Sequence, residues 1–174
     1  MADLSAAAPA TQESLWRSRQ NIIRLTFDSN ITLPPGGSVL IQQMLPGGTY
    51  GADQSSGFTF AIENDGLGNP RILKILDTDP TNFVHRNWYA VRNTGAWTGV
   101  SNFTVQYITQ IGDANNDRQV LNADAGLINA GIPNFNSGDN DRRDIDGDSA
   151  ILNADVSSTN VRIPSFPVVK PSGH

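Results

Sequence analysis

The chain has 174 residues, a formal net charge of −5 and no cysteine, which excludes disulfides, thiolate metal sites, iron–sulfur clusters and a cysteine nucleophile. The acidic balance argues against a general nucleic-acid-binding protein, because phosphates attract basic surfaces, and the two histidines argue against a multi-histidine catalytic metal site. No apolar run is close to the roughly 20 residues of a membrane-spanning helix, so the length predicts one sizeable domain or two small ones without a membrane span.

The first twenty residues are expected to be a leader or linker. The run Ala-Ala-Ala-Pro-Ala at positions 6–10 shows no pattern of core residues. No basic segment followed by an apolar one is present, so the chain as given shows no secretory signal. A mature form that had lost its signal would look the same.

Residues 21–110 are predicted to form an antiparallel β-sandwich of immunoglobulin-like size. Short runs rich in β-branched and aromatic residues alternate there with turns that contain glycine and proline. The cysteine pair that marks immunoglobulin domains proper is absent, so the prediction covers the all-β architecture alone. The candidate strands are residues 21–27, 38–44, 58–63, 71–76, 87–92 and 103–108.

The character of the sequence changes near residues 110–112. Residues 1–110 hold 8 acidic and 7 basic side chains, whereas residues 111–174 hold 9 acidic and 5 basic ones. All nine of those acidic residues are aspartates. The shift predicts a second, acidic unit over residues 111–163, followed by a tail over residues 164–174.

A twelve-residue segment of the acidic unit is duplicated, because residues 113–124 return 31 positions later as residues 144–155 and both copies end in Leu-Asn-Ala-Asp. A hard cation such as Ca²⁺ takes six to eight oxygens at about 2.3–2.6 Å, and a tight loop brings alternate side chains to one side. Positions 1, 3, 5 and 12 carry oxygen side chains, and position 7 offers a backbone carbonyl. We therefore expect two calcium sites rather than two Asp- and Asn-rich surface turns. The expected ligands are Asp113, Asn115, Asp117, Gln119 and Asp124 in the first loop and Asp144, Asp146, Asp148, Ala150 and Asp155 in the second.

Each loop is followed by a stretch predicted to be helical, over residues 123–130 and 154–163. Val120 and Ile151 stand at position 8, where the paired loops are expected to meet through a short β-bridge. Few apolar residues are available for a core, so folding of this unit is expected to depend on the metal. The apolar residues expected to form this core are Val120, Leu127, Ile128, Ile151, Val156 and Val161.

A duplicated calcium loop with an exiting helix, no entering helix and aspartate at position 12 resembles the dockerin family over residues 111–163. The resemblance implies a small, EF-hand-like, non-catalytic module of an extracellular or cell-surface protein. Such modules dock onto cohesin domains, often in assemblies that degrade polysaccharides. Loop positions 10 and 11 face the cohesin in that family, which implies Asn122, Ala123, Asn153 and Ala154 as partner-binding residues. The alternative for the two asparagines is that they cap their helices.

The residue at position 6 departs from the usual pattern of calcium loops, and the two loops differ in charge. Position 6 ordinarily carries glycine because the turn needs a positive φ, yet Arg118 and Ser149 occupy it, at a cost of about 1 kcal/mol each. The first loop carries three formal negative charges and the second carries four. The second loop is therefore expected to bind calcium more tightly.

Two other functions fit the sequence. One is a calcium-stabilised structural subunit of an extracellular assembly, in which a terminal segment docks on the sandwich of a neighbour. The other is a carbohydrate-binding module with an aromatic platform of Trp16, Trp88, Tyr89 and Trp97, although alternation along the strand places Trp88 and Tyr89 on opposite faces and favours Trp88 for the core.

Catalysis is not expected. Glu63 and Asp65 stand beside a turn and fit solvated carboxylates better than a glycosidase pair. His85 has no nucleophile or metal partner nearby in the sequence and fits an ordinary surface or packing histidine.

Overall fold

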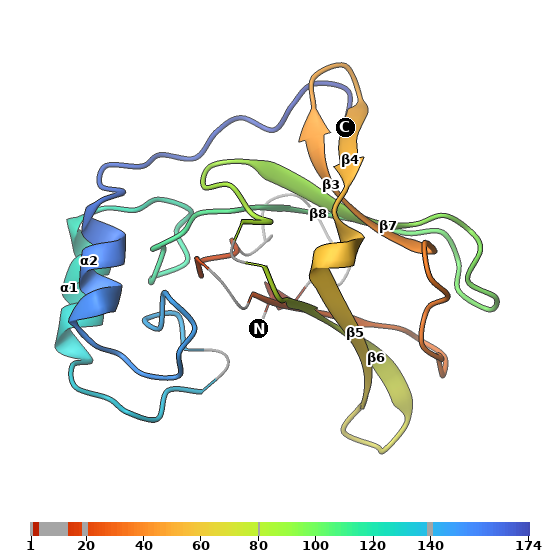
Figure 1. Cartoon of the computed structure of the whole chain (residues 1–174), viewed down its shortest axis with the longest axis horizontal. Helices are drawn as coiled ribbons and strands as arrows, with labels where there is room; N and C mark the ends of the chain where they lie inside the picture. Colours follow the sequence, from red (N-terminus) through yellow and green to blue (C-terminus); the bar gives the residue numbers. More distant parts are fainter. Residues whose placement is uncertain (1, 4–13, 19–20, 80, 139–140) are drawn as a thin grey trace.

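The computed structural model describes residues 2–3, 14–18, 21–79, 81–138 and 141–174. Within these residues an all-β half comes first and a half with two helices and long loops follows, as Figure 1 shows. The strands are β1 (Ala2–Asp3), β2 (Ile22–Thr26), β3 (Val39–Leu45), β4 (Thr49–Asp53), β5 (Phe58–Asn64), β6 (Pro70–Asp77), β7 (Trp88–Asn93) and β8 (Thr104–Ile108). A 3-10 turn, η1 (Ser55–Gly57), precedes β5, and the helices are α1 (Asn122–Ala130) and α2 (Asn153–Asn160).

The strands form two four-stranded sheets, with the orders β1-β2-β6-β5 and β4-β3-β7-β8. Neighbouring strands are antiparallel except β1 and β2, which are parallel. Ile23 and Leu73 of the first sheet share one buried core with Ile41, Val91 and Tyr107 of the second. The predicted all-β sandwich is confirmed, and the chain changes sheet after every second strand, as in the A-B-E-D and C′-C-F-G sheets of immunoglobulin-type sandwiches.

The six predicted strands are all present, each with boundaries within one residue of the prediction. Alternation is the reason, because in β2 the side chains of Ile23 and Leu25 are buried while their neighbours are not. Strand β4 has no buried residue and was not predicted. It pairs with β3 through the hairpin at Gly47 and Gly48, whose φ angles of 77° and 73° suit glycine.

The helical half has its own small core, formed by Trp16, Ile111, Ile128, Ile145 and Ile151. Ile128, Ile151 and Val120 are buried as predicted, and Val156 packs partly against this core. Leu127 and Val161, however, are 44% and 79% exposed. The face of each helix that points inward starts at the position-12 aspartate and continues four residues later. In the described part of the chain, no helix has the length and apolarity to cross a membrane.

Residues 14–18 do not behave as the expected leader, because they are built into both halves. Leu15 is buried in the sandwich core and Trp16 in the core of the helical half. The backbone amide of Leu15 donates to the carbonyl of Ile108, and the amide of Gln110 donates to the carbonyl of Leu15. The run at positions 6–10 lies outside the described residues.

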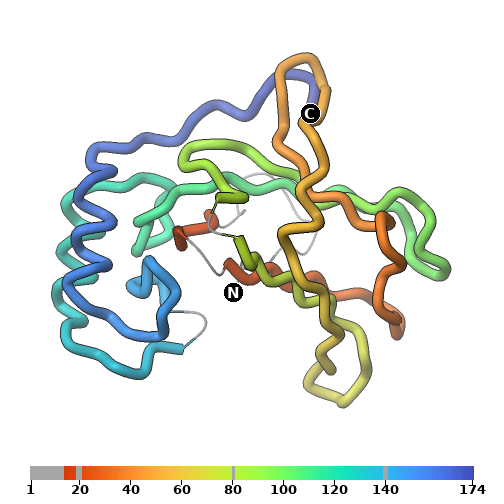
Figure 2. The backbone as a smooth tube through the Cα atoms, in the orientation of Figure 1, coloured from red at the N-terminus to blue at the C-terminus, as the bar shows by residue number. Residues whose placement is uncertain are grey.

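The predicted tail runs from helix α2 back to the sandwich, where it ends beside β3 and β4 (Figure 2). The indole N–H of Trp88 donates to the carbonyl of Val168 at 3.0 Å. The amide of Gly48 donates to the carbonyl of Ser172 at 3.0 Å, and the ring of His174 contacts Tyr50 edge to face. The tail therefore packs on the sandwich of its own chain.

Candidate metal centre

The position-1 aspartates, Asp113 and Asp144, are fully buried and anchor their loops. Asp113 accepts hydrogen bonds from the amides of Asp117 and Arg118 at 3.1 and 3.0 Å. Asp144 accepts from the amides of Gly147 and Ser149 at 2.8 and 3.2 Å. In each loop, the backbone folds around this carboxylate, which accepts hydrogen bonds from the loop amides.

The position-12 aspartates, Asp124 and Asp155, are also buried, and each joins the two ends of its loop. One oxygen of Asp155 accepts from the amides of Ile145 and Asp146 at 2.6 and 3.2 Å, and the other accepts from the amide of Leu152 at 2.8 Å. Asp124 makes the same three bonds in the first loop. Both carboxylates therefore face the loop interior from the start of a helix.

These aspartates also decide how the helices begin. Asn122 and Asn153 are the first helical residues, and the N-cap positions belong to Leu121 and Leu152. The amide of each leucine is satisfied by the aspartate three residues later. The alternative that the two asparagines cap the helices is therefore wrong.

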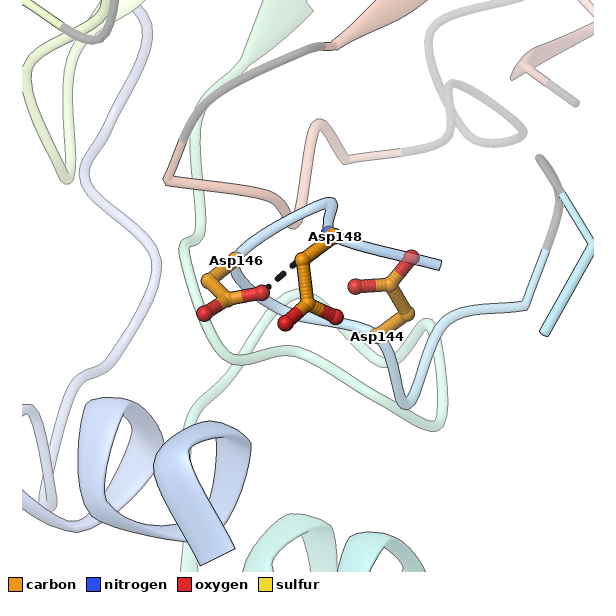
Figure 3. A group of neighbouring side chains, drawn as sticks. All are labelled: Asp144, Asp146 and Asp148. Atoms are coloured by element: carbon orange, nitrogen blue, oxygen red, sulfur yellow. Dashed lines mark hydrogen bonds between the residues drawn. The ribbon is translucent and has the colours of Figure 1, made fainter. Parts of the chain in front are cut away.

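Positions 1, 3 and 5 of the second loop bring three carboxylates together. Oxygens of Asp144, Asp146 and Asp148 lie within 4.8 Å of one another, and Figure 3 shows the three side chains around the loop. Among the described residues, no other group of three acidic or histidine side chains has this spacing. In the first loop the amide group of Asn115 instead donates to Asp117 at 3.1 Å.

Positions 4 and 6 have a left-handed backbone in both loops. Arg118 and Ser149 have φ angles of 64° and 69°, as expected for position 6, and Asn116 and Gly147 at position 4 have φ angles of 65° and 73°. At position 7, the amides of Gln119 and Ala150 donate to the position-5 carboxylates at 2.8 Å. The two predicted sites thus have the same local backbone.

The expected β-bridge between Val120 and Ile151 is not formed. Val120 pairs with Ser165, and Ile151 pairs with Asn134. Each loop is therefore joined to the segment that follows the helix of the other copy. The sequence carried a sign of this pairing, because the 31-residue repeat continues through Ile132-Pro133 and Ile163-Pro164 to the two partner residues.

Burial shapes the electrostatics of the position-1 carboxylates. Burial raises the pKa of Asp113, while a hydrogen bond from Ser14 and the charge of Arg142 act in the opposite direction. Burial likewise raises the pKa of Asp144, and the charge of Arg17 opposes it. A cation in the loops would favour the ionised form of both groups further.

The four predicted partner-binding residues lie on the surface. Asn122 and Ala123 are exposed at the start of α1, and Asn153 and Ala154 are exposed at the start of α2. Figure 1 shows the two helices side by side at the end of the molecule away from the sandwich.

The aromatic platform proposed for carbohydrate binding is not present. Trp16, Trp97 and Tyr89 are buried, and Trp88 is half-buried with its indole N–H bonded to the tail. Tyr89, and not Trp88, is the core residue of that pair, because the inward face of β7 includes Tyr89 and Val91.

The remaining polar candidates have structural partners. Glu63 forms ion pairs with Arg24 at 2.7 Å and with Lys74 at 3.5 Å, and the hydrogen bond from Arg24 lowers its pKa. Asp65 accepts the amides of two residues of its own turn. His85 accepts the amide of Ile111 at its Nδ1 and lies 2.9 Å from the hydroxyl of Ser165, so it is a packing histidine between the two halves.

Comparisons with known proteins gave no match. No protein-family model matches the chain, and neither a curated protein nor a solved structure matches it. The loop geometry and the chemistry of its side chains therefore carry the functional assignment.

Proposed function

We propose that residues 113–124 and 144–155 each bind one Ca²⁺ and that residues 111–163 are a dockerin-type, non-catalytic module. One observation carries the proposal: both loops hold a buried aspartate at position 1 and another at position 12, and the position-12 aspartates accept hydrogen bonds from equivalent backbone amides. A carboxylate is costly to bury. Four of them in two equivalent loops are well suited to compensation by two divalent cations.

The donor set favours calcium over other metals. Each loop offers carboxylate oxygens, a backbone carbonyl and, in the first loop, an amide oxygen. Zinc and other transition metals prefer histidine or cysteine, and the chain has no cysteine. A flexible loop with many oxygens suits the high and variable coordination number of Ca²⁺ better than the strict octahedron of Mg²⁺.

The exposed helix starts support an attachment function. The same pair of residues, Asn and Ala, is exposed at the start of both helices. A partner could therefore engage either copy after a half-turn of the module. We propose a cohesin-type protein domain as that partner, in an extracellular or cell-surface assembly such as those that degrade polysaccharides.

Isothermal titration calorimetry of the full chain tests the metal sites. The wild-type chain is expected to bind two Ca²⁺, and the double variant Asp144→Ala/Asp155→Ala is expected to bind one. Asp141→Ala is the control, because Asp141 lies just outside the second loop and pairs with Arg143. Two ions bound by the double variant would contradict the site assignment.

Light scattering coupled to size exclusion separates attachment from self-assembly. A compact monomer in millimolar Ca²⁺ that expands in excess chelator supports a module that docks onto a separate partner. Large species in Ca²⁺ that dissolve in chelator would instead support the structural-subunit function, in which the chain is its own partner.

A further inference from the structure

Residues 14–18 form a short segment, the N-terminal strap, that lies between the sandwich and the metal loops (Figure 2). The strap is tied to both sides. Its Leu15 amide donates to the carbonyl of Ile108 in β8, and its Ser18 amide donates to the carbonyl of Ile145 in the second loop at 2.8 Å. The strap, which precedes the first loop by almost 100 residues in the sequence, is thereby placed next to the sandwich and the second loop.

In the second loop, the strap contacts the position-1 carboxylate directly. A terminal nitrogen of Arg17 donates to Oδ2 of Asp144 at 2.9 Å, and Nε of Arg17 donates to the backbone carbonyl of the same residue at 3.2 Å. Both side chains are buried. The hydroxyl of Ser137 donates to the same Oδ2 at 3.2 Å.

In the first loop, the position-1 carboxylate also contacts one serine and one arginine, but here the strap provides the serine and not the arginine. Here the strap provides the hydroxyl, because Ser14 donates to Oδ2 of Asp113. The guanidinium comes from Arg142, which lies 3.3 Å from that oxygen and donates to the Ser14 hydroxyl at 2.7 Å. Each position-1 carboxylate thus has one serine and one arginine on the same oxygen.

This arrangement determines which oxygen of each carboxylate can bind a cation. Oδ2 of Asp113 and Oδ2 of Asp144 also accept a loop amide, so each receives three donors. A carboxylate oxygen with three donors has no lone pair left for a metal. Oδ1 receives one loop amide in each case and keeps capacity for a ligand bond.

The ring of Trp16 joins the two arginines. The guanidinium of Arg142 lies 4.3 Å from the ring centroid and that of Arg17 lies 5.8 Å from it. Both distances are within the range of a cation–π attraction. Since Trp16 is also part of the core of the helical half, one residue of the strap supports the donors of both loops.

We infer that the N-terminal strap is an integral part of the metal module and that Arg17 and Arg142 are positioning residues, which hold the position-1 carboxylates so that Oδ1 faces the ion. The inference rests on the proposed calcium function and adds a coupling to it. Metal binding and docking of the strap stabilise each other, because both depend on the orientation of the same two carboxylates.

Amide hydrogen exchange of the full chain, resolved by NMR with and without Ca²⁺, tests the coupling. Removal of Ca²⁺ with a chelator is expected to speed exchange of the Ser18 amide about tenfold or more, together with the loop amides. The Leu15 amide, which bonds to the sandwich, should change far less. Loops that respond to Ca²⁺ while Ser18 does not would overturn the strap inference alone. Loops that do not respond would overturn the calcium function and the inference with it.

Variants test the positioning role in saturating Ca²⁺. Arg17→Ala is expected to speed exchange in the second loop about tenfold and to leave the first loop nearly unchanged, whereas Arg142→Ala should do the reverse. Arg17→Lys should restore part of the protection, since an ammonium can reach the carboxylate but not the carbonyl as well. Arg143→Ala is the control, because Arg143 pairs with Asp141 outside the loop. Equal effects of Arg17→Ala and Arg143→Ala, or effects spread over both loops, would overturn the assignment.

Discussion

Four buried aspartates dominate the chemistry of the helical half at the scale of single residues. Asp113, Asp124, Asp144 and Asp155 have almost no exposed surface. Backbone amides, hydroxyls and guanidinium groups replace the water that these carboxylates lose. Each loop still carries more negative charge than the arginines in and beside it neutralise, which supports the proposed divalent cation.

The backbone at position 6 gives a prediction at this scale. Ser149 has a φ of 69°, where a side chain costs about 1 kcal/mol relative to glycine. Ser149→Gly is therefore expected to stabilise the Ca²⁺-bound chain by about 0.5–1 kcal/mol, measured by urea denaturation. Ser157→Gly, inside α2, should destabilise it by a similar amount. A destabilised Ser149→Gly variant would show that the side chain contributes more than its backbone costs.

His85 gives a pH-dependent prediction. Burial lowers its pKa from the ordinary 6.5 to about 4, and the charges of Arg162 and Arg86 act in the same direction. The unfolded chain therefore binds a proton at His85 more readily than the folded chain, so the stability from this residue is present above about pH 6.5 and is lost as the pH falls through 4.

The measurement is the free energy of unfolding between pH 7 and pH 4 for the wild type and for His85→Gln. The variant cannot take up this proton, so its stability should fall less steeply with decreasing pH in that window. Parallel curves for the two chains would contradict a lowered pKa of the half-buried His85.

At the scale of elements, the two helices depend on their contacts. Helix α1 has nine residues and α2 has eight, and isolated helices shorter than about 12–15 residues are marginal in water. The inward face of each helix has only two buried residues, which are Asp124 and Ile128 in α1 and Asp155 and Thr159 in α2. The loops and the core beneath them must therefore supply most of the stability.

Two neighbouring residues of α1 test the contribution of the core to the stability of the helical half. Ile128 is fully buried, whereas Leu127 is 44% exposed. Ile128→Ala is expected to cost about 2–5 kcal/mol of the free energy of unfolding in Ca²⁺. Leu127→Ala should change it by about 0.5 kcal/mol or less, and similar losses for both variants would place Leu127 in the core.

The sequence was sufficient to predict the elements whose residues carry their own pattern. Alternating apolar residues predict six strands, and the repeated aspartates predict both loops. The stretches after the loops predict both helices, although α2 ends at Asn160 and not at residue 163 as predicted. Strand β4 was missed because it has no buried face. Leu127 and Val161 were placed in the core because apolar character alone does not tell which side of a short helix faces inward.

The contacts between distant segments could not be predicted. Leu15 and Trp16 had no periodic neighbours, so nothing marked them as core residues of two different halves. The repeat marks Ser165 and Asn134 as equivalent positions, but their pairing with Val120 and Ile151 depends on how the two copies are arranged in space. Local patterns report on local structure, and these contacts are set by the packing of the whole module.

At the scale of the whole molecule, calcium should stabilise the helical half selectively. A ligand at 100 times its Kd adds about 2.7 kcal/mol per site to a folded state that alone binds it. The helical band of the far-UV circular dichroism follows this half, because α1 and α2 are the α-helices of the described residues. The midpoint of the thermal unfolding transition followed by this band is expected to rise in Ca²⁺ and to fall in chelator. An unchanged midpoint would contradict metal-coupled folding.

The returning tail gives the helical half a closed topology. Strand β8 leads into it, and the tail leaves it to meet β7 again at Trp88, so both ends of the intervening chain are held on adjacent strands of one sheet. If the metal is lost and this half unfolds while the sandwich persists, the released chain remains a loop with fixed ends. Such a loop has less conformational entropy than a free end, so under the proposed calcium function the sandwich would lower the entropy cost of refolding when the ion is restored.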